Sequence, residues 1–221
     1  HQTVLHKWDK YDLRDRLKEG LYQKHGVAAN NFLQTMPVND ARKAVGMFKD
    51  EYLLDYINIE EMEVDKPEDI DERVIEKAIV RNIKKFIMTF GRDFAYIGNQ
   101  YHLEIFGEEL FPDLLFLNRE LNCMVVVELK KGAFKPSYIG QLQTYMKVLD
   151  DKVRKPHENP TIGILLCKSA NKAFVEYVIR DYNHPMGVAT YKTAEDMSEE
   201  LRKALPDMDE MRKLLTDDSD I

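Results

Sequence analysis

Residues 111–145 read FPDLLFLNRELNCMVVVELKKGAFKPSYIGQLQTY, and this stretch decides the predicted fold. Two apolar runs, residues 114–117 and 124–127, flank a polar break at residues 118–120. Short apolar runs on either side of a polar break are typical of two buried strands joined by a tight turn. We therefore predict an antiparallel hairpin here, with the centre of its turn just after Glu120.

This turn position brings three charged residues together. It places Asp113 directly opposite Glu128, and directly opposed residues point to the same face of a sheet. Lys130 follows Glu128 by two residues and shares that face, because side chains alternate along a strand. Charged groups in a buried strand need partners or a metal ion. The cluster is either a salt bridge at the solvated end of the strands or a catalytic site.

A helix is predicted to follow the hairpin, because Pro136 suits a first helical turn. Gln141, Leu142, Tyr145 and Leu149 recur at helical spacing after it. Gln141 and Tyr145 are four residues apart and therefore lie on one face of the helix. We expect both side chains to point toward the charged cluster.

The order of these motifs resembles the PD-(D/E)xK nuclease superfamily. Residues 112–113 match its "PD" motif, residues 128–130 match "ExK", and residues 141–145 match the Gln-x-x-x-Tyr signature of some branches. Residues 94–151 more closely resemble the C-terminal region of the bacterial DUF1016 family, also called the YhcG family. The runs GNQYHLEIFGEELFPDLLF and VVVELKKGAFKPSYIGQLQTYMKVLDD carry this likeness, and weaker similarity extends over residues 13–191.

The resemblance implies an α/β fold of the restriction-endonuclease-like kind, with a mixed central sheet flanked by helices. It also implies a site for Mg²⁺ or Mn²⁺ at Asp113 and Glu128, with the backbone carbonyl of Leu129, since hard cations favour oxygen ligands. Glu76, on a helix before the sheet, matches the position of a further metal-site carboxylate. The alternative for Glu76 is an ordinary surface glutamate.

The resemblance also assigns catalytic roles. Lys130 would position a water or stabilise the transition state, Gln141 would orient the water or a phosphate, and Tyr145 would brace Gln141. The expected catalytic residues are Asp113, Glu128, Lys130, Gln141 and Tyr145. Lys131 and Lys135 are the expected nucleic-acid-binding residues.

Composition limits the classes of function. The chain has 221 residues, 44% of them hydrophobic, and a net charge of −7. Proteins that coat nucleic acid non-specifically are more often basic, but a nuclease site itself collects carboxylates. No apolar run approaches the ~20 residues that cross a membrane. Cys123 and Cys167 lack metal-ligand spacing, so we expect buried thiols and a reducing, cytoplasmic location.

Three regions are predicted along the chain. Residues 1–66 form a helical N-terminal segment, residues 67–192 a PD-(D/E)xK nuclease-like domain, and residues 193–221 a charged helical tail. The chain begins with His1 and not methionine, so we expect a fragment of a longer protein or a trimmed chain. The family resemblance implies that the first region is the end of a truncated domain. It is a candidate surface for a homodimer or a partner protein.

Within these regions, helices are expected around residues 13–21, 41–56, 71–90, 136–150 and 171–180. Residues 26–38 are expected to form a loop. Strands are expected at residues 94–105, with Gly98 as a possible bulge, at 161–167, parallel to the Glu128 strand, and at 186–191.

We thus expect a Mg²⁺-dependent endonuclease that hydrolyses phosphodiester bonds of DNA, in repair, recombination or restriction. The alternative is a catalytically silent module on the same fold that binds nucleic acid or another protein.

Overall fold

The computed structural model describes residues 9–18, 26–54, 72–91, 93–193 and 196. The helices are α2 (Lys10–Lys18), α4 (Phe32–Thr35), α5 (Val38–Met47), α6 (Glu72–Arg81), α7 (Ile83–Phe90), α8 (Ser137–Lys152) and α9 (Lys172–Ile179). The strands are β1 (Ala29–Asn30), β2 (Glu51–Leu54), β3 (Phe94–Asn99), β4 (Leu103–Ile105), β5 (Glu108–Leu110), β6 (Leu114–Asn118), β7 (Cys123–Ala133), β8 (Asn159–Ser169) and β9 (Met186–Thr193).

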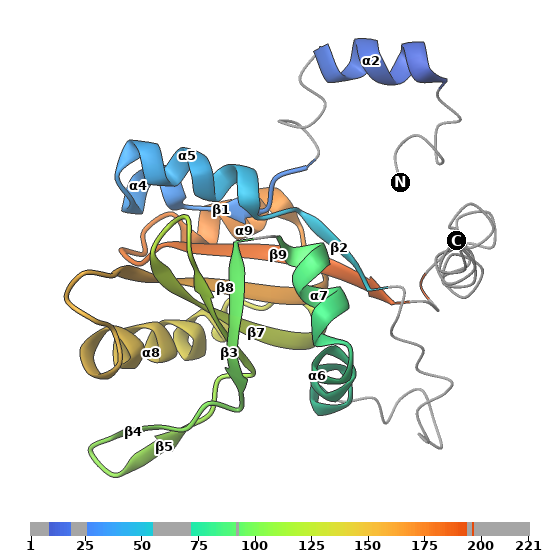
Figure 1. Ribbon diagram of the computed structural model, residues 1–221. Coiled ribbons are helices and arrows are strands. Elements are labelled where there is room, and N and C mark those ends of the chain that lie inside the picture. Colours follow the sequence, from blue (N-terminus) through green and yellow to red (C-terminus); the bar gives the residue numbers. More distant parts are fainter. Residues whose placement is uncertain (1–8, 19–25, 55–71, 92, 194–195, 197–221) are drawn as a thin grey trace, which may run out of the picture.

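A mixed sheet forms the centre of the molecule (Figure 1). Within the described residues it has seven strands in the order β1-β9-β8-β7-β6-β3, and β2 also pairs with β9. Strands β7, β8 and β9 are mutually parallel, as predicted for residues 161–167, and β3, β6 and β7 are antiparallel neighbours. The predicted α/β class with a mixed central sheet is confirmed.

The central hairpin has the predicted register. Leu114 pairs with Val127, and the pairing continues to Asn118 opposite Cys123. Both strands are almost wholly buried, which explains their continuous apolar runs, because helices cover both faces of this part of the sheet.

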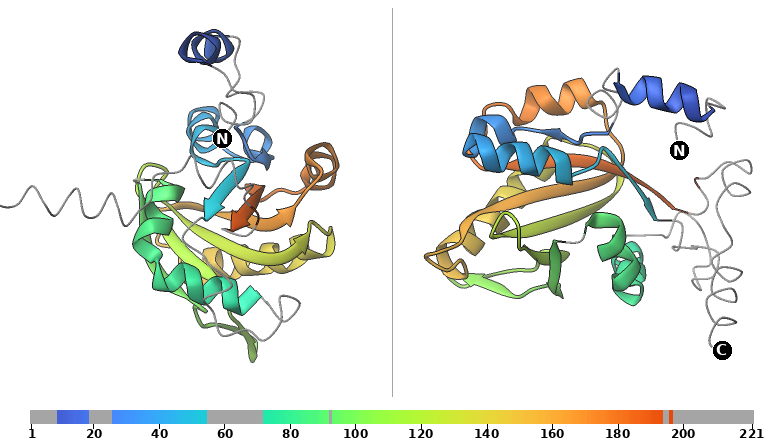
Figure 2. Two further views of the ribbon diagram at one scale, coloured as in Figure 1. Left: turned by 90° about the vertical axis from the view of Figure 1, so that its right-hand side faces the viewer. Right: turned by 45° about the horizontal axis from the view of Figure 1, so that its top comes forward.

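The helices cover the sheet in two layers (Figure 2). Side chains of α5, α6 and α7 pack on the face that carries Leu114 and Val127. Side chains of α8 and α9 pack on the opposite face, which carries Leu115 and Val126. Glu128 follows Val126 by two residues, so alternation directs it toward the α8 side.

Helix α8 lies unusually close to the sheet at Gly163 in β8. A β-carbon at this glycine would lie 2.9 Å from Cγ of Leu142 and would also overlap Sδ of Met146. The absence of a side chain at Gly163 therefore sets the distance between α8 and the sheet.

The N-terminal part differs from the prediction. The helix expected over 41–56 ends at Met47, and β2 follows it, while the expected loop at 26–38 contains β1 and α4. Tyr52 and Leu54 are buried and alternate with half-buried neighbours, the period of a strand and not of a helix. Both β1 and β2 pair with β9, so the sheet contains strands from both sides of the predicted boundary at residue 66.

The strand predicted over 94–105 is also divided. β3 ends at Asn99, and residues 103–110 form a separate β4–β5 hairpin. The pairing of β3 with β6 shifts between Tyr96 and Gly98, which confirms the predicted bulge. The division lies at Gln100, whose φ of 44° is in the left-handed region and cannot continue a strand.

The helices predicted from the sequence in the rest of the chain agree more closely with the structure. The helix expected over 71–90 is present as α6 and α7, separated at Asn82, and α8 begins after Pro136 as predicted. The linker near residue 67 and, apart from Thr193 and Asp196, the C-terminal tail lie outside the described residues. Among the described helices, none combines the length and the apolar character that a membrane span requires.

Candidate active site

Asp113 and Glu128 lie at the end of the central hairpin, where β6 begins and β7 continues. The register that pairs Leu114 with Val127 brings Asp113 opposite Glu128 one position further. The carboxylate of Asp113 reaches across to β7, where Oδ2 accepts a hydrogen bond from the backbone N–H of Leu129 at 2.8 Å. Glu128 is 2% exposed. The hairpin thus brings two carboxyl groups together in a largely dry environment.

Lys130 lies beside these two carboxyl groups. It is on the same face of the sheet as Glu128, as predicted. Its Nζ donates to Oε1 of Glu128 at 2.9 Å and lies 5.4 Å from the centre of the Tyr138 ring. Its backbone carbonyl accepts a hydrogen bond from the hydroxyl of Tyr191. Lys130 is buried, so its ammonium is held at a defined position instead of moving in solvent.

Burial and a neighbouring negative charge raise the pKa of both carboxyl groups, the neighbour being Asp113 for Glu128 and Glu76 for Asp113. Burial is the main cause that raises the pKa of Glu128 to about 7, and the negative charge of Asp113 adds to it. Burial likewise raises the pKa of Asp113 to about 6, although the Leu129 N–H and the Lys130 charge act in the opposite direction. The raised pKa values of these two neighbouring carboxyl groups indicate that the ammonium of Lys130 does not fully offset the cost of burying their negative charge.

The donor set of this pair fits a hard divalent cation. Oε2 of Glu128 is buried, and no group in the described ranges donates a hydrogen bond to it. A buried carboxylate oxygen without a donor is costly in an apolar environment. Carboxylate oxygens are the ligands that Mg²⁺ prefers, so a cation between Asp113 and Glu128 would satisfy this oxygen.

Glu76 of α6 also lies at this end of the sheet. It is 3% exposed, so it is not an ordinary surface glutamate. Its Oε1 accepts from Nδ2 of Asn99 and its Oε2 from Nε2 of Gln100, each at 2.8 Å. The same Gln100 nitrogen donates to Oδ1 of Asp113 at 3.0 Å. Glu76 is thus connected to Asp113 through an amide.

The structure gives no direct support to Glu76 as a third ligand of the same ion. In the parts of the chain that are described, no three His, Cys, Asp or Glu side chains come close enough to hold a metal ion together. The predicted pair of Asp113 and Glu128 therefore forms the compact part of the site.

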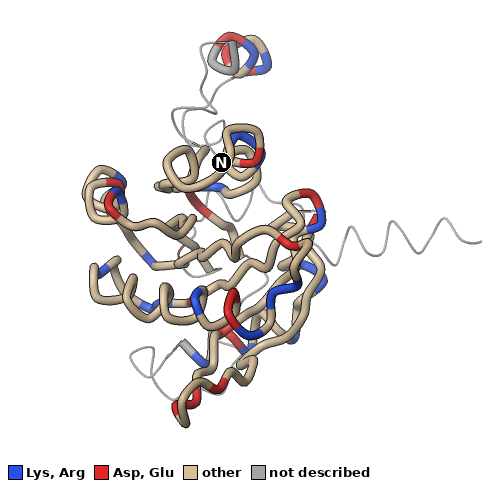
Figure 3. Tube along the Cα trace, turned by 90° about the vertical axis from the view of Figure 1, so that its left-hand side faces the viewer, with Lys and Arg blue, Asp and Glu red and all other residues tan. Residues whose placement is uncertain are grey.

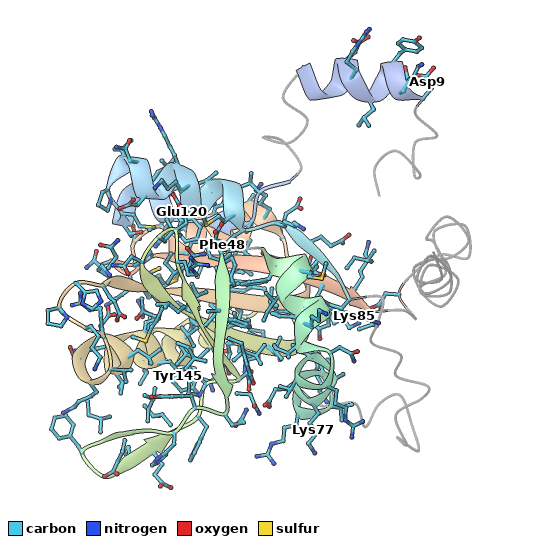
Figure 4. All side chains as sticks on the ribbon, in the orientation of Figure 1. Asp9, Phe48, Lys77, Lys85, Glu120 and Tyr145 are labelled. Atoms are coloured by element: carbon cyan, nitrogen blue, oxygen red, sulfur yellow. The ribbon has the colours of Figure 1, made fainter. Side chains whose placement is uncertain are left out.

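Gln141 and Tyr145 interact with each other on α8, as their spacing predicts. Nε2 of Gln141 donates to the hydroxyl of Tyr145 at 2.8 Å. Figure 4 shows Tyr145 at the junction of α8 and the sheet. Burial raises the pKa of Tyr145, the bond from Gln141 opposes this, and the charges of Glu128 and Asp113 add to it. Tyr145 is therefore close enough to respond to the carboxyl pair.

Lys131 and Lys135 lie on the surface near this site. Both are exposed, and Lys131 directly follows the buried Lys130 in β7. Figure 3 shows basic and acidic positions interspersed over one side of the molecule, with acidic residues toward the tip of the β4–β5 hairpin. Positive charge near the site is therefore local and does not form one continuous basic face.

Sequence reasoning did not assign a role to Asn99 or Gln100. The continuous strand predicted over residues 94–105 would place Gln100 and His102 on one face. In the structure His102 contacts Glu109 and stacks on Phe111 in the hairpin region, whereas Gln100 turns toward Asp113. The left-handed backbone of Gln100 separates the two, and no pattern in the sequence indicated it.

The comparisons with known proteins agree with this geometry. Residues 45–206 match the family described as the YhcG PDDEXK nuclease domain. The chain belongs to this family. The predicted resemblance is therefore confirmed, and the match begins before the predicted boundary at residue 66.

A curated relative is the candidate nuclease YhcG of Escherichia coli (strain K12). It is 26% identical over 175 residues, which cover 79% of this chain and 42% of the relative. The chain thus spans less than half of the length of this relative.

Similar solved structures include EndoMS in its apo form, a repair endonuclease from Pyrococcus abyssi and an EndoMS–dsDNA2 complex. Each is 17% identical to this chain, with TM-scores of 0.37, 0.36 and 0.37. The matches cover 58%, 57% and 62% of this chain and 48%, 48% and 51% of the respective structures. The family assignment rests on the match over residues 45–206.

Proposed function

We propose that this chain is the catalytic part of a metal-dependent endonuclease that hydrolyses phosphodiester bonds of DNA. The single observation that carries the proposal is the pair formed by the half-buried Asp113 and the buried Glu128, with one oxygen of Glu128 lacking a hydrogen-bond donor among the described residues. Its support is membership of a family of nuclease domains.

Asp113 and Glu128 are the proposed ligands of Mg²⁺ or Mn²⁺, with the backbone carbonyl of Leu129. When bound, such a cation supplies an acidified water and offsets negative charge that develops on the phosphate. Glu128 also holds the ammonium of Lys130 through its other oxygen. One carboxyl group would thus serve both the ion and the lysine.

Lys130 is the proposed electrostatic residue of the reaction. Its burial, its bond to Glu128 and the Tyr138 ring beside it restrict where the ammonium can lie. A charge that is already fixed in a dry site stabilises a transition state more than a mobile charge in water does. Lys130 would therefore stabilise the phosphate oxygens on which charge develops.

Gln141 and Tyr145 are proposed to orient the attacking water or a phosphate. Tyr145 is buried and accepts a hydrogen bond from the exposed Gln141. The tyrosine thereby limits the orientations available to the glutamine amide. The carbonyl oxygen of that amide would then be the atom that accepts a hydrogen bond from the water.

The remaining assignments concern partners. Lys131 and Lys135 are proposed to contact DNA phosphates beside the site. The N-terminal region is proposed to contact a second copy or a partner protein. The proposed process is DNA repair, recombination or restriction.

The buried thiols of Cys123 and Cys167 suit a reducing compartment, so we propose a cytoplasmic location.

A nuclease assay tests the central proposal. Plasmid, single-stranded and branched DNA are incubated with the chain in Mg²⁺, in Mn²⁺ and in a chelator. We expect cutting only with metal, and a loss of about 10²-fold or more in Glu128→Gln. Glu120→Gln is the matched control, because Glu120 forms an exposed ion pair with Lys43 away from the site.

Three results would contradict the proposal. Cutting that persists in the chelator would exclude metal dependence. Salt-dependent DNA binding without cutting in any metal would select the alternative, a silent nucleic-acid-binding module. If DNA is neither bound nor cut, a protein-interaction module is the better description.

A further inference from the structure

The side chain of Gln100 lies between two carboxyl groups that belong to different elements. Its Nε2 donates to Oε2 of Glu76 in α6 at 2.8 Å and to Oδ1 of Asp113 at 3.0 Å. An ionised carboxylate only accepts hydrogen bonds, and an amide nitrogen carries two hydrogens. The nitrogen of Gln100, and not its oxygen, must therefore face both carboxyl groups, with one hydrogen directed to each.

We infer that the Gln100 amide takes the position of a cation between Glu76 and Asp113, so that the site holds one divalent cation and Glu76 is a positioning residue. The single cation lies between Asp113 and Glu128. Glu76 then acts through Gln100, which fixes the orientation of Asp113. This inference rests on the proposed metal-dependent function and deepens it.

The distribution of hydrogen-bond donors supports different roles for Glu76, which positions Asp113, and Glu128, which would hold the cation. Both oxygens of Glu76 have a donor, supplied by Asn99 and Gln100. Both oxygens of Asp113 also have one, supplied by Gln100 and the backbone of Leu129.

Glu128 differs from the other two carboxyl groups. Its Oε1 accepts from Lys130, but its Oε2 has no donor within the described part of the chain. The buried oxygen that lacks a donor therefore belongs to Glu128.

The backbone of Gln100 shows that this position is specifically held. Its φ of 44° is unfavourable for a residue with a β-carbon. Its N–H donates to the carbonyl of Asp113 at 3.1 Å, which ties the two backbones together at this conformation. Strained residues persist where the surrounding structure determines them, and they concentrate at functional sites.

Asn99 aligns Glu76 from its other side. The hydroxyl of Tyr96 donates to Oδ1 of Asn99 at 2.9 Å, which leaves Nδ2 of Asn99 directed at Glu76. A series of hydrogen bonds thus runs from Tyr96 to Asp113 through two amides and one carboxyl group. Its members come from β3, α6 and the segment before β6.

Calorimetric titration with Mn²⁺ on the full chain tests the stoichiometry. We expect wild type to bind one Mn²⁺, and Glu76→Gln to bind one with a loss of affinity of about 10–100-fold. Gln100→Ala removes the amide and should bind two. Gln100→Ala combined with Glu76→Gln should return to one, and Gln143→Ala, which removes an amide on α8 that is not part of this bridge, should stay at one.

A second variant protects the test against a folding defect. Gln100→Asn keeps an amide and suits a left-handed backbone, but its side chain is one carbon shorter and cannot reach both carboxyl groups. It too should bind two Mn²⁺. If both Gln100 variants bind one, or if wild type binds two and Glu76→Gln removes one, the inference is overturned.

A measurement without metal separates this inference from the proposed function. Urea unfolding in a chelator gives a double-mutant cycle for Gln100→Ala and Glu76→Ala. We expect a coupling of about tenfold in the unfolding equilibrium constant, since an amide bonded to a charged group is stabilising. No coupling overturns the bridge. Wild type that binds no Mn²⁺ overturns the proposed function and the single-cation assignment, even where the coupling is present.

Discussion

At the scale of single residues, Lys130 and Lys131 have opposite surroundings although they are neighbours in β7. Lys130 is buried and its ammonium bonds to Glu128, whereas Lys131 is exposed. Alternation along the strand produces this difference. The two lysines therefore offer a matched pair of substitutions one residue apart.

We predict that Lys130→Ala removes most of the chemical step, with a ~10²–10³-fold drop in turnover at saturating DNA. Lys131→Ala should instead weaken DNA binding and reduce its salt dependence by about one phosphate contact. Steady-state cleavage and salt-dependent binding of both variants check this. The reverse pattern, with turnover lost in Lys131→Ala, would exclude Lys130 from the reaction.

The raised pKa values of Asp113 and Glu128 predict how stability depends on pH without metal. Both pKa values in the folded chain, about 6 and about 7, exceed the ordinary values of these side chains. The fold therefore favours the protonated forms. The contribution of this pair to the free energy of unfolding should be fully present below about pH 4, where both groups are protonated in the unfolded chain as well, and should be lost as pH rises from there through 6 and 7, by up to about 1.4 kcal/mol per pH unit for each proton.

Urea unfolding in a chelator between pH 5 and pH 8 measures this slope. Glu128→Gln removes one titrating group and should reduce the slope. Some slope should remain, because burial also raises the pKa of Asp50. A stability that rises with pH over this range in wild type would show that the carboxyl pair is stabilised when ionised.

Sequence reasoning reached some site residues and missed others for a physical reason. Asp113, Glu128 and Lys130 were accessible, because strand alternation and one turn position determine their shared face. Gln100 was not, because its role depends on a left-handed backbone and on a contact with Glu76, 24 positions away. Periodicity describes regular elements, and Gln100 lies at the point where one ends.

At the scale of elements, dependence on periodicity also explains which strands could be predicted from the sequence. The β6–β7 hairpin was predicted with its register, because two apolar runs leave little freedom for the polar turn between them. Strand β1 has two residues and β2 has four, too few for a period to be recognised. Their pairing is determined by β9, which is distant in the sequence.

Asn31, directly after β1, holds the connection between α9 and β9 in place. Its Nδ2 donates to the carbonyls of Ile179, Tyr182 and His184, and its Oδ1 accepts from the N–H of Met186. Asn31 is 1% exposed. One buried amide therefore links four backbone groups between the end of α9 and the start of β9.

We predict that Asn31→Ala lowers the free energy of unfolding by about 2–4 kcal/mol, because it leaves buried polar groups without partners. The half-buried neighbour Asn30 serves as the control, since its side chain bonds only locally, to Ala28 and Phe32. Denaturant unfolding of both variants measures the difference. Equal losses would show that the contacts of Asn31 add nothing beyond a local turn.

At the scale of the whole molecule, the N-terminal region contributes to the core of the sheet domain. Phe32, Phe48 and Tyr52 are each at most 1% exposed and belong to the cluster that includes Phe90 and Phe116. Strands β1 and β2 lie beside β9. Without them, β9 would present an unpaired edge.

We therefore predict that a variant beginning at residue 67, where the sequence suggested a domain start, does not fold cooperatively. Burial of each large side chain contributes about 1.5–3 kcal/mol. The loss of three buried aromatic residues therefore removes a large share of the stability that is typical of a folded domain. A variant beginning at residue 26 should fold. Size-exclusion chromatography and urea unfolding distinguish them, and a monomeric, cooperative 67–221 fragment would contradict the prediction.

Gly163 gives a means of controlling this protein in a living cell. An added methyl group there would force α8, which carries Gln141 and Tyr145, away from β8. Overpacking of this kind costs about 1–3 kcal/mol, a loss that most domains tolerate in the cold and fewer tolerate when warm. Gly163→Ala should thus behave as a temperature-sensitive allele. Shifting the temperature would deplete the protein on demand, with every residue of the carboxyl pair still in place.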